Sequence, residues 1–396
     1  MNLRERISWI KTKIQADLFP HLKECFPDQI TQKQKQLITI LEIVEVERHV
    51  KLPEYQWMGR KLKDRYAIGR AFVAKAVYNL GTTRALIEAL HTMPNLRRIC
   101  GFDGSSFTVT REGATVDGKL LSVVKKRGSF PSEATFSRAF CEFAESGLGE
   151  RVHEALVREH LSEELIGHIS RDSTAIEGNE RPAEKFPKKS GTWDNKEERK
   201  KRGRPRKGEV RVERKEETRL NVQINQTPAE ALKDIPMMCD VGCKTNAKGY
   251  KETWIGYKLH ADTNDSGLPI TAVLTSASLH DSQVAIPMMK ITTERVTYLY
   301  DLMDAAYDAK PIYEVSKALG HVPIIDRNPR RGESVPMSPA EALRYNERTV
   351  AERFNARLKD EFGGRSVMVR GAKKVRMHLM FGVIALFADQ LLKLLT

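Results

Sequence analysis

The chain has 396 residues, of which 40% are hydrophobic and 30% are charged. This balance is typical of a soluble protein with two or three domains and a buried core. The formal net charge of +14 favours a polyanionic partner, of which nucleic acid is the commonest, although basic surfaces also bind acidic membranes.

Four classes of protein are disfavoured: secreted, membrane-spanning, disulfide-stabilised and zinc-binding proteins. Residues 1–15 lack the uninterrupted apolar core of a signal peptide, and residues 377–396 are too broken by polar side chains to span a bilayer, so we expect a final core helix there. The five cysteines are scattered and odd in number, which predicts a reducing cytoplasm without a disulfide framework. A zinc site at Cys239 and Cys243 is disfavoured because a second ligand pair at the usual spacing is missing.

Residues 1–160 are predicted to form a mainly helical N-terminal domain. Residues 69–80 are apolar on nearly all sides, which indicates a buried helix, and Thr82 can cap the next one. Residues 101–128 are expected to be irregular. Ser132 can then cap a helix that leaves Arg138 toward solvent. This region fits a helix-turn-helix that contacts DNA through Arg138, but it equally fits a helical bundle that packs on the rest of the chain or dimerises.

The second predicted domain, residues 161–396, begins with a short apolar strand at 165–169. Asp172 lies just beyond the apolar part, where a carboxylate can project into a cleft. The alternative is an Asp that begins a turn with Ser173 and Thr174.

A basic, flexible insertion is predicted at about 177–250, because large apolar residues nearly vanish in its first part. Within it, Arg202, Gly203, Arg204 and Pro205 match the core of an AT-hook, whose arginines enter the minor groove of A·T-rich DNA. The alternative is an ordinary solvated basic run.

After the insertion the pattern becomes strand-like. Residues 253–261 and 268–275 predict an antiparallel hairpin, and strands at 295–303 and 321–326 alternate with a helix at 309–319. The simplest architecture that accommodates these elements is α/β, a mixed sheet flanked by helices. Asp304 follows the first of those two later strands.

The stretch 345–359 is predicted to be one helix. Tyr345, Arg348, Glu352 and Lys359 return to one face at offsets of three, seven and fourteen residues, while an apolar stripe at Val350 seats the helix on a core. The acid on this face can hold a metal and the bases can hold phosphate. The alternative is an ordinary surface pair between Arg348 and Glu352.

Asp172, Asp304 and Glu352 together suit two divalent metal ions, the standard apparatus for in-line attack on a phosphodiester. Asp326 also ends a strand and is the reserve for the second position. The other nearby candidates are expected to have structural roles: Asp281 and Asp308 as helix caps, Asp301 as a residue inside its strand, and His260 as a structural histidine.

The spacing of Tyr345, Arg348, Glu352 and Lys359 resembles the Y-(2)-R-(3)-E-(6)-K signature of bacterial insertion-sequence transposases with a DDE catalytic domain. Residues 304–308 are similar to the second-aspartate motif of that family, and 171–174 to the first. Residues 256–260 and 279–282 resemble further recurrent segments. The likeness covers most of the chain, although Ala306 stands where the family commonly has Gly.

This resemblance implies an RNase H-like fold that cleaves transposon ends and joins them to target DNA, with Mg²⁺ or Mn²⁺, two ions, bound by Asp172, Asp304 and Glu352. Tyr345, Arg348 and Lys359 would position the phosphates of the double-stranded DNA. It also implies a homodimer or higher assembly on DNA, in the bacterial cytoplasm at the nucleoid and without a membrane partner. The alternatives are a structure-specific nuclease of the same fold, or a non-catalytic A·T-rich DNA-binding protein derived from a transposase.

Overall fold

The computed structural model describes residues 29–51, 64–102, 107–116, 119–128, 130–183, 218–245, 249–328 and 336–394. Their main sheet has six strands: β3 (Leu165–Glu177), β4 (Asp240–Thr245), β5 (Lys251–Asn264), β6 (Pro269–Ser276), β7 (Thr297–Met303) and β8 (Val322–Ile325). The strand order is β4-β5-β3-β7-β8, with β6 also paired to β5. β5 runs antiparallel to β3, β4 and β6, whereas β3, β7 and β8 are parallel. The prediction of a mixed α/β sheet is therefore confirmed.

Strand β5 is long enough to pair with three strands, and Gly256 makes this possible. It is the residue at which the pairing of β5 passes from β4 to β3. Its φ of +149° suits glycine, and an added Cβ would lie 2.2 Å from the carbonyl oxygen of Ile176. The predicted hairpin of β5 and β6 is confirmed with the expected antiparallel pairing.

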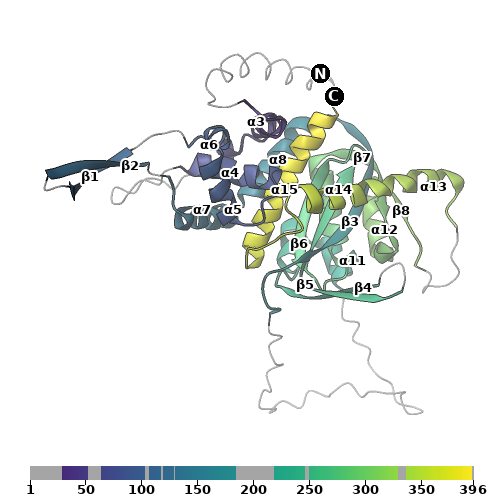
Figure 1. Cartoon of the computed structure of the whole chain (residues 1–396). Coiled ribbons are helices and arrows are strands. Elements are labelled where there is room, and N and C mark those ends of the chain that lie inside the picture. The colour runs from purple at the N-terminus through teal and green to yellow at the C-terminus, as the bar shows by residue number, and fades with distance from the viewer. Residues whose placement is uncertain are drawn as a thin grey trace, which may run out of the picture.

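Helices cover both faces of the sheet. On one side lie α11 (Ser282–Arg295) and α12 (Lys310–Ala318), whose apolar faces pack with β7 and β8 around Ile286, Met303 and Ile312. On the other side α14 (Thr349–Glu361) and α15 (Ala372–Lys393) share a core with β3, β5 and β6. Figure 1 shows α15 between the sheet and the N-terminal helices.

The N-terminal helices are α3 (Gln32–Val44), α4 (Arg65–Val77), α5 (Thr83–Thr92), α6 (Pro94–Ile99), α7 (Glu133–Ser146) and α8 (Leu148–Leu161). Thr82 caps α5 as predicted, through a hydrogen bond from the amide of Ala85. Phe72 of α4 lies 4.8 Å from Phe140 of α7 and 5.5 Å from Phe381 of α15, between ring centroids. The two regions predicted as separate domains therefore share one hydrophobic core.

Among the described helices, α15 alone is long and apolar enough to cross a membrane, but 83% of its most apolar window is buried inside the protein. It packs against α3, α4, α7, α8, α14 and β6. It is a core helix, as the polar interruptions in its sequence predict.

The expectation that 101–128 is irregular was wrong. This stretch forms β1 (Phe107–Val116) and β2 (Lys119–Gly128), an antiparallel pair that projects from the helices in Figure 1. The missed signal was Asp117-Gly118, a dipeptide typical of two-residue hairpin loops. Because this hairpin separates α6 from α7, those helices are not consecutive elements of a helix-turn-helix.

Two other expectations need adjustment. β3 does not end near Ile169 but continues to Glu177, because its polar second half pairs with β5. The single helix expected at 345–359 is divided into α13 (Pro339–Tyr345), a 3₁₀ turn at Asn346–Arg348, and α14. Its apolar stripe begins only at Val350, and α13 has no buried residue to hold a continuous helix on the core.

Residues 218–245 lie inside the range predicted as a flexible insertion. They form α9 (Arg219–Asn225), α10 (Pro228–Lys233) and β4. Thr218 and Thr227 cap the two helices through their hydroxyl groups, as is usual for threonine at this position.

Candidate active site

Asp172 and Asp304 are brought together by the parallel pairing of β3 and β7. The last paired residues of the two strands are Arg171 and Met303, and each is followed directly by one of the two acids. Since neighbouring strands lie about 4.8 Å apart, the two carboxylates extend from adjacent positions on β3 and β7. Asp172 thus lies within β3 at the end of its parallel pairing, rather than in a turn with Ser173 and Thr174.

Both acids are electrostatically strained without a cation. Burial raises the pKa of Asp172 to about 6, and the neighbouring Asp304 adds to the rise, while the backbone N–H of Ser173 opposes it. Burial also raises the pKa of Asp304, and Asp281 adds to that rise. The amide of Ala306 donates to Asp304 Oδ1 at 2.9 Å and partly offsets the effect. Two adjacent buried acids of this kind favour a bound cation.

Helix α14 lies over these acids. Asn355 donates from Nδ2 to Asp172 Oδ2 at 3.0 Å, which fixes this face of α14 against β3. Glu352 is three residues earlier on the same face, but its carboxylate is half exposed and accepts a hydrogen bond from Arg348 Nη2 at 2.7 Å. The pair expected of an ordinary surface helix is therefore present.

Arg348 also acts on the two aspartates. Its charge lowers the pKa of both Asp172 and Asp304. Burial lowers the pKa of Arg348 itself, but Tyr345 and the three acids together raise it. Within the described residues, no three His, Cys, Asp or Glu side chains surround one point closely enough to hold a metal ion. Arg348 therefore acts on the two aspartates through its charge, while its hydrogen bond goes to Glu352.

Two buried polar atoms at the site have no hydrogen-bond partner. Tyr307 Oη is fully buried, and this burial raises the pKa of its phenol, as do Asp281, Asp172 and Asp304. Asn355 Oδ1, on a side chain that is 7% exposed, also lacks a partner. Orphaned polar atoms beside paired carboxylates suit a hydrated divalent cation, because oxygen ligands and water would satisfy both groups.

The remaining signature residues lie along the same edge. Tyr345 is half-buried, and burial raises the pKa of its hydroxyl to about 12 against the lowering effect of Arg348, whose guanidinium lies 5.7 Å from the centre of the ring. Lys359, one turn beyond Asn355, is half-buried, and burial lowers the pKa of its ammonium with further contributions from Lys244 and Arg365. This excess of cations suits a phosphate backbone.

Asp281 and Lys258 also belong to the site, although Asp281 was predicted only to cap a helix. Asp281 is the N-cap residue of α11 but makes no capping hydrogen bond through its side chain. It instead accepts from Lys258 Nζ at 2.8 Å and also bonds the side chain of Ser173. The signal in the sequence is the segment 279–282, which resembles a recurrent part of the DDE domain and contains this acid.

The other competing acids have different partners. Asp308 does not cap α12 but accepts a hydrogen bond from the amide of Asn328 at 3.1 Å. Asp301 lies inside β7 as expected, fully buried, and His260 is a buried histidine bonded to Thr275. The AT-hook-like residues 202–205 lie outside the described residues, and Arg138 lies on the exposed face of α7.

A buried ionic network lies directly beneath the site. Arg171, fully buried, donates to Asp262 on β5 at 2.7 Å and lies 3.5 Å from Asp301 on β7. The three central strands are thereby joined next to Asp172. Removing one member of such a network leaves an uncompensated charge.

Comparison with protein families gives two matches. A model described as a transposase DDE domain matches residues 241–388, and a second model described as a transposase domain of the DUF772 family matches residues 24–112. The first match includes Asp304 and Glu352 but not Asp172. Searches of curated proteins and of solved structures found no match. Both matched segments are transposase domains, and the mixed sheet carries two paired aspartates. The chain is therefore an insertion-sequence transposase of the DDE type.

Proposed function

We propose that this transposase binds the ends of its element, cleaves one strand at each end and joins the freed 3′-hydroxyl to target DNA, with Asp172, Asp304 and Glu352 as its catalytic acids. The supporting observation is that Asp172 and Asp304 follow the last parallel pair of β3 and β7, while Asn355 holds α14 over them. DDE transposases depend on divalent metal, and we assign Mg²⁺ or Mn²⁺, as two ions, to this site.

Bound at these acids, such ions supply the positive charge that activates the attacking oxygen and stabilises the leaving oxygen of a phosphodiester. Asp172 and Asp304 provide the fixed part of the site, because both start from the sheet. Glu352 provides the movable part, because its half-exposed carboxylate must leave Arg348 to join them. In cleavage, water attacks phosphorus and the strand leaves as a 3′-hydroxyl, and in transfer that hydroxyl attacks the target phosphodiester.

Arg348, Tyr345 and Lys359 are proposed to hold the phosphates on either side of the reacting one. An arginine released from Glu352 presents a planar pair of donors that matches phosphate oxygens. Tyr345 and Lys359 lie on the two sides of Arg348 along the chain and would extend the contact. We further propose that the protein acts in the cytoplasm as a dimer or higher assembly on DNA.

The test is purified protein with labelled end DNA and Mn²⁺, followed by gel analysis of nicked and joined products. Asp172→Asn, Asp304→Asn and Glu352→Gln should each lower cleavage at least a hundredfold while DNA binding is kept. Asp326→Asn is the matched control, since this acid ends the neighbouring strand and should leave cleavage unchanged. Intact cleavage in the first three variants would refute the assignment of the catalytic acids. Nicking without any joined plasmid product would indicate a nuclease.

A further inference from the structure

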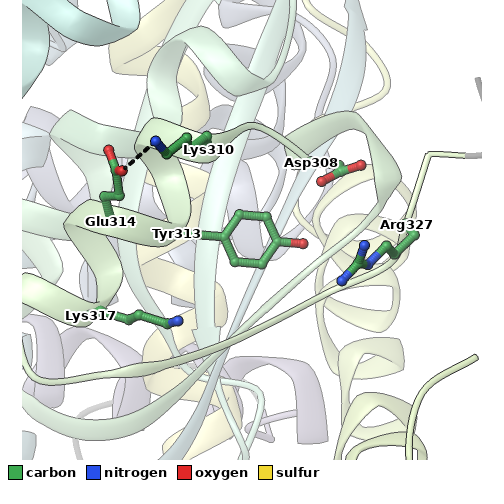
Figure 2. Close-up of a pocket in the computed structure, with 6 residues that line it drawn as sticks. All are labelled: Asp308, Lys310, Tyr313, Glu314, Lys317 and Arg327. Atoms are coloured by element: carbon green, nitrogen blue, oxygen red, sulfur yellow. Dashed lines mark ion pairs between the residues drawn. The ribbon is translucent and has the colours of Figure 1, made fainter. Parts of the chain in front are cut away.

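A hollow of about 500 Å³ lies one strand away from the paired aspartates, lined by Asp308, Lys310, Tyr313, Glu314, Lys317 and Arg327. Figure 2 shows the ring of Tyr313 between the Lys310 and Glu314 pair on one side and Arg327 on the other. Five of the six residues are charged, and none of them is one of the acids assigned to catalysis.

The hollow is tied to the active edge of the sheet. The amide of Asp326, at the end of β8, donates to the carbonyl of Met303, the residue before Asp304, at 3.2 Å. The amide of Asn328 donates to Asp308, at the end of the second-aspartate segment, at 3.1 Å. Asp308 is the fourth residue after Asp304, so their backbones are at most about 14 Å apart. That distance corresponds to about four nucleotides along one DNA strand.

The acids of the hollow are already occupied. Tyr313 donates its hydroxyl hydrogen to Asp308, and Glu314 pairs with Lys310 at 3.4 Å. In contrast, no ion pair links Lys317 or Arg327 to an acid of the described residues. The positive charge of the hollow is therefore in excess at those two side chains, both of which are exposed.

The arrangement matches a strand of nucleic acid better than a small acid. Residues 310, 313, 314 and 317 share one face of α12, whose opposite face is buried at Ile312 and Val315. Two unpaired cations beside the ring of a half-buried tyrosine supply phosphate contacts and a stacking surface together. Arg327 also begins a basic run with Arg330 and Arg331 in the sequence.

We propose that this hollow, defined by Tyr313, Lys317 and Arg327, binds the DNA strand that runs past the cleaved phosphate, within a few nucleotides of it. Lys317 and Arg327 contact backbone phosphates, and a base or sugar packs on the ring of Tyr313. This assignment rests on the proposed function for its choice of ligand, but it concerns residues that take no part in the chemical step.

The test measures binding of a fluorescein-labelled duplex that carries one end of the element, by anisotropy in EDTA across a salt series. Lys317→Gln with Arg327→Gln should weaken binding at least tenfold and reduce the slope of log K against log salt by about 1.8, since each phosphate contact contributes about 0.9. Tyr313→Ala should weaken binding about tenfold, whereas Tyr313→Phe should not, because the hydroxyl is engaged by Asp308.

Lys233→Gln serves as the matched control, because it removes one exposed lysine charge on α10. It should leave the slope unchanged. A double variant with the wild-type slope, or a loss as large in the Lys233 control, overturns the proposal. Because binding is read without metal, these outcomes are independent of cleavage. Active-site variants that still cleave would refute the catalytic assignment without affecting the proposal for the hollow. Hollow variants that bind DNA like the wild type would refute the proposal for the hollow without affecting the catalytic assignment.

Discussion

Replacing Asp172 with asparagine should stabilise the metal-free protein. Burial and Asp304 raise the pKa of Asp172 from 3.8 to about 6, so between these values the folded chain holds a proton that the unfolded chain releases. The free energy of unfolding therefore falls as pH rises through this window. At about 1.4 kcal/mol per pKa unit, the charged form costs about 3 kcal/mol above pH 6. Asp172→Asn removes this cost, and its oxygen can still accept from Asn355.

The assay is thermal unfolding in EDTA at several pH values. An unfolding entropy of about 2 cal/mol/K per residue gives about 0.8 kcal/mol/K for this chain, so 3 kcal/mol corresponds to an increase in Tm of about 4 °C. The gain should be complete at pH 7.5, reduced at pH 5 and absent below pH 4. Mn²⁺ should raise the Tm of the wild type more than that of the variant. A variant that is no more stable at pH 7.5, or whose gain does not depend on pH, refutes the electrostatic reasoning.

Three further substitutions test the core and the counter-ion. Burial lowers the pKa of Lys75 to about 8, so between pH 8 and 10.5 the unfolded chain binds a proton that the folded chain has lost. The free energy of unfolding of the wild type, relative to that of Lys75→Met, should therefore rise by about 3 kcal/mol across this window. Urea titrations at several pH values measure this difference. Arg171→Met should lower the free energy of unfolding by about 3–5 kcal/mol in the same assay, because two buried aspartates lose their cation. Arg348→Gln should tighten Mn²⁺ binding several-fold without DNA, measured by electron paramagnetic resonance, because Glu352 loses its competing partner.

The sequence predicted those parts of the fold in which the hydrophobic pattern covers the same residues as the strand pairing. The hairpin of β5 and β6 and the strand that precedes Asp304 carry their apolar side chains on regular faces, so both could be predicted. The second half of β3 is polar because it lies at the site, and its pairing to β5 is a long-range contact that no local pattern encodes. For the same reason, the apolar pattern ends near Ile169 although the strand itself continues through Asp172.

The candidate acids of the site could be selected from the sequence, but the side chains that surround them could not. Spacing along a helix places Glu352 and Arg348 on one face, and strand ends point to Asp304. Contacts of Asn355 with Asp172, and of Lys258 with Asp281, join residues far apart in sequence. Their geometry depends on how α11 and α14 pack on the sheet, which side-chain types alone do not determine.

The contact between Arg348 and Glu352 illustrates why a surface-type ion pair and a catalytic assignment are compatible. A partly exposed i,i+4 pair contributes only a few tenths of a kcal/mol, so it cannot hold Glu352 against a divalent cation. Burial, by contrast, raises the pKa of both Asp172 and Asp304, so added positive charge stabilises their ionised forms. Arg348 supplies part of that charge. Under the proposed function, DNA phosphate would attract the same guanidinium, so release of Glu352 from Arg348 would accompany substrate binding.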